Sequence, residues 1–187
     1  MRKLAKAKSK KWYKILAPRE LGNIEIGETL SSDPNYLIGR RITLNGLEID
    51  ESTNKFYMKF YFRIDKVEGD RAYTLFDGSE CLRDYISRMV VRRVTRIDVV
   101  QDVKMKDGVV IRVKSIIVVP RKATSTVKKS IRKTVKEIVE KEVSSRELKD
   151  MIGILLTDSL KEKVLKEIKK IYPIRNYEIR KTEVIGS

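Results

Sequence analysis

The period of the hydrophobic pattern changes at Pro120, and this change limits the folds that the chain can adopt. Before Pro120 apolar and polar residues alternate, most clearly from Phe56 to Ile64. A period of two is typical of half-buried strands, whereas the spacing of three and four that follows Pro120 is typical of amphipathic helices. We therefore predict an α+β protein in which a β-rich body over residues 20–120 precedes a helical part over residues 121–187.

The clearest predicted strand has two unlike faces. Its inner face is apolar and consists of Phe56, Met58, Phe60, Phe62 and Ile64. Its outer face mixes rings with cations at Tyr57, Lys59, Tyr61 and Arg63. The outer face is interpreted as a solvated sheet surface, with base stacking as the alternative.

Turn residues divide the rest of the body into short antiparallel strands. Glu68-Gly69-Asp70 predicts one turn, and Asp107-Gly108 predicts a two-residue hairpin of type I′, which requires positive φ. The segment from Leu37 to Asp50 is interpreted as a strand pair or a bent strand, with a turn at Asn45-Gly46. Such a set of strands is expected to form an antiparallel barrel-like or strongly curled sheet.

One helix is predicted within the body, near residues 80–92. Ser79 is its expected N-cap, and its apolar face comprises Leu82, Tyr85, Ile86, Met89 and Val90. Its other side carries Arg83, Arg88, Arg92 and Arg93. An arginine-rich helix face in a strongly basic chain favours phosphate contact over simple solvation.

Three helices and a closing strand are predicted after Pro120. The first has an apolar stripe at Val127, Ile131, Val135, Ile138 and Val143. Two capping-box patterns, Ser144-x-x-Glu147 and Ser159-x-x-Glu162, predict the starts of two shorter helices. Tyr172-Pro173 ends the last helix, and a final strand is expected near residues 174–185.

The charge of the chain indicates a polyanionic partner. Lys and Arg number 42 against 26 Asp and Glu, which gives a net charge of +16. Residues 1–19 hold eight basic residues and no acidic one, with Trp12 and Tyr13 among them. Basic segments with aromatic rings suit RNA, whose unpaired bases stack on such rings, so residues 1–19 are interpreted as an RNA-binding extension. For Trp12, a role as a core anchor is an equal alternative.

A second basic zone runs from the end of the β-rich body into the first long helix, because no acidic residue occurs between Gly108 and Lys136. Together these patterns predict the following RNA-binding residues: Arg2, Lys3, Lys6, Lys8, Lys10, Lys11, Trp12, Tyr13, Lys14, Arg40, Arg41, Arg83, Arg88, Arg92, Arg93, Arg96, Arg121, Lys122, Lys128, Lys129, Arg132 and Lys133.

Composition argues against most enzyme classes. The chain has no histidine and one cysteine, Cys81, so histidine-based triads, histidine metal sites, cysteine-based zinc sites and internal disulfides are excluded. We expect no cofactor, no membrane association and a cytoplasmic location. One enzyme alternative is a Mg²⁺-dependent nuclease, because Asp102-Val103-Lys104 resembles part of a nuclease motif and Asp77 supplies an upstream carboxylate. A free RNA- or DNA-binding regulator is a further alternative.

Several blocks resemble one ribosomal protein family in order and spacing. They include residues 11–18 (KWYKILAP), 74–78 (TLFDG), 92–98 (RRVTRID), 171–175 (IYPIR) and 178–181 (EIRK). This set resembles the archaeal and eukaryotic small-subunit ribosomal protein family S three Ae, also called eS-one, in an archaeal-type short form. The resemblance implies a structural, non-enzymatic constituent of the small ribosomal subunit. It also implies a place on the platform near the messenger exit, with small-subunit rRNA, neighbouring ribosomal proteins and mRNA near the exit as partners.

Overall fold

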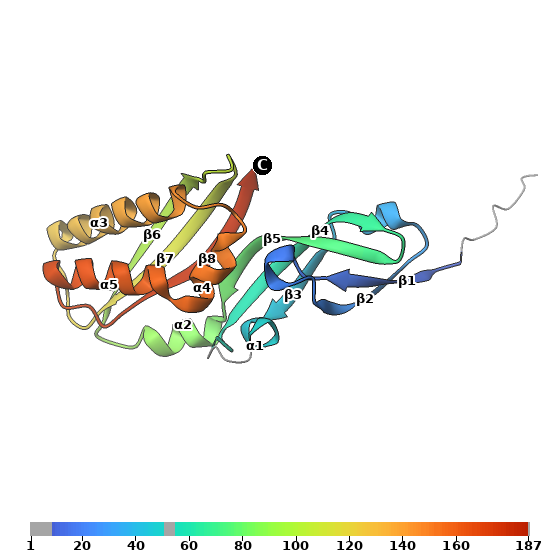
Figure 1. Cartoon of the computed structure of the whole chain (residues 1–187). Helices are drawn as coiled ribbons and strands as arrows, with labels where there is room; N and C mark the ends of the chain where they lie inside the picture. Colours follow the sequence, from blue (N-terminus) through green and yellow to red (C-terminus); the bar gives the residue numbers. More distant parts are fainter. Residues whose placement is uncertain (1–8, 51–54, 187) are drawn as a thin grey trace, which may run out of the picture. The chain divides into compact units, whose positions relative to one another are not determined.

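The computed structural model describes residues 9–50 and 55–186. Within them the chain forms eight strands, which belong to one branched sheet, and five α-helices (Figure 1). The strands are β1 (Lys11–Leu16), β2 (Glu25–Ser31), β3 (Arg41–Asn45), β4 (Met58–Glu68), β5 (Arg71–Cys81), β6 (Thr95–Lys104), β7 (Val110–Val119) and β8 (Asn176–Gly186). The helices are α1 (Gly46–Ile49), α2 (Arg83–Met89), α3 (Ser125–Ser144), α4 (Asp150–Thr157) and α5 (Ser159–Ile171), with short 3-10 helices at Arg19–Leu21 and Pro34–Tyr36. The predicted α+β class is confirmed.

The sheet is not closed into a barrel, so the barrel-like form of the predicted fold is wrong, and the sheet is not wholly antiparallel, because β1 pairs with β5 in parallel. The strands follow the order β2-β1-β5-β8-β7-β6, and β4 pairs with both β3 and β5. The reason lies in β5, which pairs with β1 through residues 71–73 and with β8 through residues 78–80. Because one strand exchanges partners along its length, the sheet branches instead of curling round to close.

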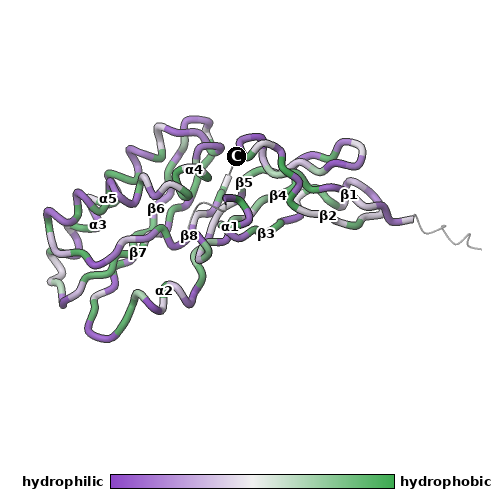
Figure 2. Tube along the Cα trace, turned by 60° about the horizontal axis from the view of Figure 1, so that its bottom comes forward, coloured by the Kyte–Doolittle hydropathy of each residue, from purple (hydrophilic) through white to green (hydrophobic). Residues whose placement is uncertain are grey.

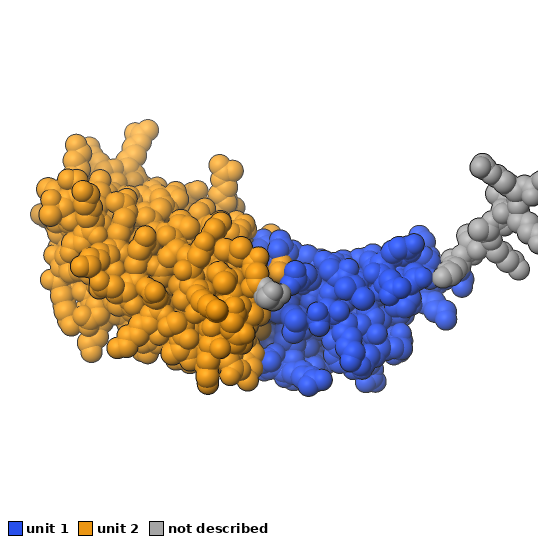
Figure 3. All heavy atoms as spheres, turned by 90° about the horizontal axis from the view of Figure 1, so that it is seen from above, with its two compact units in different colours: residues 1–43, 61–76 blue, residues 44–60, 77–187 orange. Residues whose placement is uncertain are grey.

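The chain divides into two compact units, coloured separately in Figure 3. Unit 1 comprises residues 1–43 and 61–76, and unit 2 comprises residues 44–60 and 77–187. In unit 1, β1 pairs with β2 in an antiparallel hairpin and with β5 in parallel. A small core forms there around Tyr13, Leu37, Ile64 and Ala72.

Unit 2 is a layer of helices on an antiparallel sheet. Strands β6, β7 and β8 pair in order, and helices α3 and α5 pack on β6 and β8 and against each other. Hydrophobic and hydrophilic residues alternate along α3 and α5 (Figure 2), as amphipathic helices require. The buried stripe of α3 is Ile131, Val135, Val139 and Val143. The predicted stripe is correct for Ile131, Val135 and Val143, whereas Val127 and Ile138 are only half-buried and Val139 was not predicted.

The strand from 56 to 64 begins two residues later than its alternation indicates. Met58, Phe60, Phe62 and Ile64 are all at most 2% exposed, as predicted. Phe56, however, precedes β4 and is 56% exposed, whereas Tyr57 is buried at 7%. The prediction is wrong for these two residues because alternation holds only where the backbone is extended.

Two of the predicted helix starts are also wrong. Ser79 does not cap α2, because β5 continues to Cys81 and the Ser79 hydroxyl hydrogen bonds that of Thr182 at 2.8 Å. Ser144 is the last residue of α3, whose buried stripe extends to Val143, and α4 starts only at Asp150. The other predicted start is close, since α5 begins at Ser159 itself.

Of the three predicted turns, one is found as predicted and two differ in the structure. Gly69 and Asp70 join β4 to β5, as predicted. The Asp107-Gly108 hairpin is confirmed, but among the described residues of its loop only Gly108 has positive φ, at 87°, so the turn is not type I′. Asn45-Gly46 opens helix α1 instead of a turn, since the Glu48 carboxylate accepts a hydrogen bond from the Asn45 N–H at 3.1 Å.

Candidate nucleic-acid interface

Helix α2 and the turn after it present four arginines to solvent. The helix packs with Tyr85, Ile86 and Met89 half-buried, which leaves Arg83 and Arg88 exposed on its outer side. Arg92 and Arg93 follow in the turn that leads to β6, and both are exposed. Arg93 adopts a left-handed conformation with φ of 68°, which bends the chain into that strand.

Strand register brings three basic segments to one end of the unit 2 sheet. Thr95 at the start of β6 lies opposite Val119 at the end of β7, and Asn176 at the start of β8 lies opposite Val118. The loops at these strand ends therefore meet. They carry Arg92, Arg93, Arg121, Lys122 and Arg175, all exposed, and we call these five residues the basic end.

The five cations of the basic end have no acidic partners in the part of the chain that the structure describes. No ion pair joins any of its five side chains to an acidic residue in the described parts of the chain. Elsewhere in unit 2 cations are commonly neutralised, for example Arg112 by Asp102 at 2.7 Å and Lys163 by Glu142 at 2.7 Å. The uncompensated positive charge is therefore concentrated, and concentrated charge attracts phosphates.

The cations of α3 that were predicted to bind RNA differ in their exposure and in their partners. Lys129 is exposed, and Lys128 is half-buried. The Arg132 guanidinium donates to the Asp98 carbonyl at 3.3 Å, and Lys133 lies 3.9 Å from Glu137. Arg132 thus ties α3 to β6 while Lys129 faces solvent.

Arg96 is neutralised within its own strand. Its guanidinium donates to both carboxylate oxygens of Asp98, with the shortest contact at 2.8 Å. The sequence placed Arg96 with Arg92 and Arg93, but only the latter two lie before β6 begins at Thr95.

In unit 1 the aromatic pair on β1 divides between surface and core. Trp12 is 63% exposed, whereas Tyr13 is 6% exposed and packs with Leu37, Ile64 and Ala72. Alternation along the strand places neighbouring side chains on opposite faces, so only one ring of the pair is buried. The core anchor is therefore Tyr13, and Trp12 presents its ring to solvent.

The cations around this pair have varied surroundings. Lys10 and Lys11 are exposed, while Lys14 pairs with Glu25 at 2.9 Å, and that hydrogen bond raises the pKa of Lys14. Arg40 donates to the Thr29 hydroxyl, and Arg41 lies over the Tyr61 ring, 5.2 Å from its centroid. Arg2, Lys3, Lys6 and Lys8 were predicted as RNA ligands and lie outside the described residues.

The residues of the nuclease alternative do not form a metal site. Asp102 accepts two hydrogen bonds from the Arg112 guanidinium, at 2.7 and 2.8 Å, and these hold the pKa of its carboxyl below the usual range. Asp77 is buried at 6%. In residues 9–50 and 55–186, no group of three acidic or cysteine side chains could hold a metal ion. The D-x-K pattern here is part of a cross-strand ion pair.

Cys81 lies at the end of β5 and is buried. Burial raises the pKa of its thiol to about 12, so the residue packs as a small apolar side chain. Among the described helices, none combines the length and the apolar character needed to cross a lipid bilayer.

Sequence reasoning missed Arg175 as a candidate ligand. The residue follows Pro173 just before β8, and its backbone N–H donates to the Val118 carbonyl at 2.8 Å. It joins the basic end only because β8 pairs with β7, a contact between segments about 60 residues apart. The one signal in the sequence was its place in the IYPIR block.

A basic α+β fold with uncompensated cations gathered at one sheet end is characteristic of nucleic-acid-binding proteins. Comparison with known proteins narrows this class. The model of the Ribosomal S3Ae family matches residues 1–187, and the chain belongs to that family. The family is one of ribosomal structural proteins and not of enzymes.

Curated relatives agree with the family match. The chain is 39% identical over 185 residues to the small ribosomal subunit protein eS1 of Methanothrix thermoacetophila, covering 99% of this chain and 88% of the relative. It is 39% identical over 184 residues to eS1 of Methanopyrus kandleri, covering 96% and 87%. The eS1 protein of Methanoculleus marisnigri is 32% identical over 183 residues, covering 98% and 93%.

Proposed function

We propose that this protein is a structural constituent of the small ribosomal subunit in the cytoplasm and that it binds the subunit's rRNA through the basic end. The observation that carries the proposal is the set of five exposed cations without acidic partners among the described residues. Such cations neutralise phosphates that RNA folding brings close together, and the release of counterions favours binding. Guanidinium groups add fork-shaped hydrogen bonding to phosphate oxygens.

The N-terminal segment is a second RNA-binding element in this proposal. Lys10, Lys11 and the exposed ring of Trp12 lie side by side along the chain at the start of β1. Cations interleaved with an exposed aromatic ring suit RNA that offers both phosphates and unstacked bases. Lys14 contributes less, because Glu25 already neutralises it.

The position of the protein in the subunit is a finer proposal that rests on the resemblance between its sequence blocks and the family. We place it on the platform near the messenger exit, in contact with neighbouring ribosomal proteins and with mRNA that passes there. Cryo-electron microscopy of small subunits from cells that carry a tagged copy of the chain tests this placement. Density for the tag elsewhere on the subunit would refute it.

Two charge-matched variants test the RNA interface. The first carries Arg92→Gln, Arg93→Gln, Arg121→Gln and Lys122→Gln, and the control carries Arg96→Gln, Arg112→Gln, Lys163→Gln and Lys170→Gln. Each removes four positive charges, but the control cations are paired with acidic residues. RNA affinity is measured between 50 and 200 mM salt, conditions over which phosphate contacts are strongly weakened.

In the first variant, the slope of log K against log salt concentration should fall in magnitude by about 3. Each lost phosphate contact lowers that magnitude by roughly 0.7 to 0.9. The control variant should lose much less, because its cations have acidic partners. Equal losses in the two variants would show that net charge alone governs binding, and they would refute the basic end as the RNA-binding site. Sedimentation of the tagged chain with small subunits after a high-salt wash checks incorporation in cells.

A further inference from the structure

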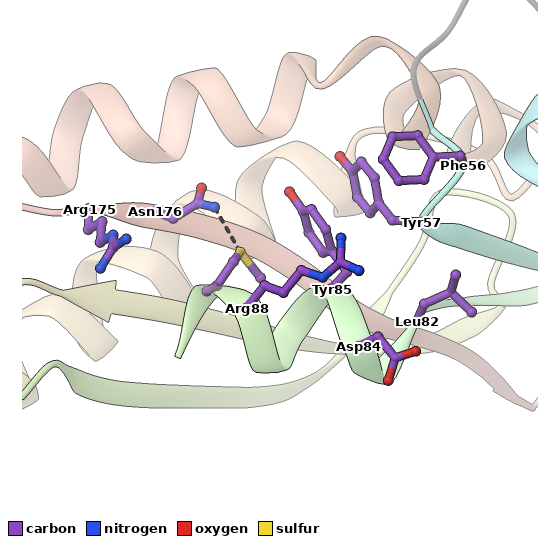
Figure 4. A pocket seen from close by; sticks show the side chains of 9 residues that line it. Phe56, Tyr57, Leu82, Asp84, Tyr85, Arg88, Arg175 and Asn176 are labelled. Carbon is purple, nitrogen blue, oxygen red and sulfur yellow. Dashed lines mark hydrogen bonds between the residues drawn. The ribbon is translucent and has the colours of Figure 1, made fainter. Parts of the chain in front are cut away.

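A pocket of about 540 Å³ lies in unit 2 between α2 and the start of β8 (Figure 4). Phe56, Tyr57 and Tyr85 contribute aromatic rings to its lining, and Leu82 adds an aliphatic side chain. Arg88 of α2 and Arg175 of the basic end line it as well. The pocket therefore adjoins the surface proposed to bind RNA.

The aromatic wall of this pocket is held rigidly. The Tyr57 and Tyr85 rings stack with centroids 3.8 Å apart and planes 12° from parallel. Phe56 packs edge-on against Tyr57 at 5.7 Å. Stacked and edge-to-face pairs of this kind add stability beyond the area that they bury.

Buried charged residues anchor both tyrosine hydroxyls behind the wall. The Tyr85 hydroxyl donates to the Glu178 carboxylate at 3.1 Å, and the Tyr57 hydroxyl accepts from the Lys55 ammonium at 3.1 Å. Glu178 and Lys55 are 3% and 4% exposed. Burial raises the pKa of both tyrosines, so the rings remain neutral and their positions do not depend on pH near neutrality. The wall is thus preformed.

The exposed groups of the pocket indicate its chemistry. Phe56 leaves 56% of its surface open to solvent. In the described parts of the chain, neither Arg88 nor Arg175 forms an ion pair, although Asp84, one turn from Arg88 on α2, also lines the pocket. Figure 4 shows the Phe56 ring at one end of the pocket and Arg175 at the other, with Arg88 between them, so the lining combines a stacking surface with phosphate donors.

We propose that this pocket takes a single unstacked nucleotide of an RNA strand, with the base against Phe56, the adjoining phosphate at Arg88 and a following phosphate of the strand at Arg175. The pocket volume falls in the range of sites for small ligands, which fits one nucleotide. RNA is recognised mainly through bases that leave the helical stack and rest on aromatic rings or guanidinium planes. This inference rests on the proposed function and names the part of the RNA that the site holds.

The test uses Phe56→Ala and Arg175→Gln in the full chain, with controls that share chemistry but not location. Tyr36→Ala removes an aromatic ring that is 73% exposed in unit 1, and Arg83→Gln removes an arginine from the same helix α2 that does not line the pocket. The probes are a single-stranded RNA with one 4-thiouridine and a fully paired RNA duplex of equal length. Affinity and the site of the photo-crosslink are measured for each.

We expect Phe56→Ala to weaken single-stranded binding by roughly 5- to 100-fold and to leave duplex binding and the salt slope unchanged, as loss of one stacked base requires. Arg175→Gln should lower the magnitude of the salt slope by about 1, and crosslinks should map to the pocket residues in the parent chain.

Equal effects of Phe56→Ala and Tyr36→Ala would refute nucleotide binding in the pocket but would leave the proposed role of the basic end intact. Loss of neighbouring proteins from reconstituted subunits, with RNA affinity unchanged, would assign the pocket to a protein partner. Failure of the parent chain to bind either RNA would refute the proposed function itself.

Discussion

Gly78 lies directly against the backbone carbonyl of Thr182, where β5 meets β8. A Cβ atom on Gly78 would come within 2.3 Å of that carbonyl oxygen, and the residue has φ of 152°. The sheet of unit 2 joins β5 at this point, through pairs between residues 78–80 and 181–183. The close approach of the two backbones therefore requires glycine.

Gly78→Ala is expected to lower the free energy of unfolding by at least about 3 kcal/mol, because the methyl group clashes with backbone that cannot move aside. Gly153→Ala is the matched control. Gly153 is exposed within α4, and a methyl group on it would meet nothing within 4 Å, so alanine should stabilise by about 0.5 to 1 kcal/mol. Urea denaturation monitored by circular dichroism measures the free energy of unfolding of both variants. An unchanged value for Gly78→Ala would contradict the close approach of the two backbones.

The buried pair of Lys55 and Asp158 is expected to respond unequally to loss of either partner. Lys55 is nearly inaccessible, with 5% of its side chain exposed, whereas Asp158 is 35% exposed. Asp158→Asn should therefore destabilise by about 3 kcal/mol, since it leaves a buried ammonium without its counterion. Lys55→Met should cost less, because water can reach the remaining carboxylate. In a double-mutant cycle the double variant should be more stable than Asp158→Asn alone, and a strictly additive result would argue against the pair.

Glu183 is expected to make the free energy of unfolding depend on pH in the acidic range. Hydrogen bonds from Lys114 and Lys181, at 2.6 and 2.8 Å, lower the pKa of its carboxyl to about 2. Because the folded pKa lies below the ordinary value of 4.5, the contribution of Glu183 is complete above pH 4.5 and is lost as the pH falls toward 2. Glu183→Gln should flatten the stability profile in that window. Glu162→Gln, on the exposed side of α5, should leave the profile as it is in the parent chain.

Neighbouring aromatic residues on β1 should differ sharply when truncated. Tyr13→Ala removes a core ring and should destabilise by about 3 to 4 kcal/mol, whereas Trp12→Ala should change stability by less than about 1 kcal/mol. Trp12 is the only tryptophan, so its fluorescence reports one site. In the free protein this emission should be quenched readily by iodide. A shielded Trp12, or a Tyr13→Ala variant as stable as its parent, would contradict the structure of unit 1.

Local patterns in the sequence were sufficient for most strands and for the presence of the three C-terminal helices, but not for the start of α4. Met58 to Ile64 alternate because one face of β4 is buried, and the stripe of α3 follows from its helical period. Where tertiary contacts decide, local patterns were misleading. Ser79 has the chemistry of an N-cap, yet Thr182, more than 100 residues away, engages it within the sheet.

The candidate site shows the same division. The positive charge of α2 and of the turn before β6 is visible in the sequence because Arg83, Arg88, Arg92 and Arg93 occur close together. Arg96 is neutralised by Asp98 only because both side chains lie on the same face of β6, and Arg175 joins Arg121 at one end of the sheet only through strand register. Pairing and burial of charges are properties of three-dimensional neighbours, so composition alone overstates the number of cations available to a ligand.

The place of β8 in the sheet bears on how the nascent chain folds. This strand is synthesised after every other described element, yet it lies between β7 and β5 and pairs with both. Strands β6 and β7 can pair as a hairpin before β8 is made, but β5 and β7 have no common partner until residues 176–186 are available. Helices α3 and α5 must therefore be made before the sheet that they cover is complete, and the growing polypeptide exposes unpaired strand edges to its surroundings until translation reaches β8.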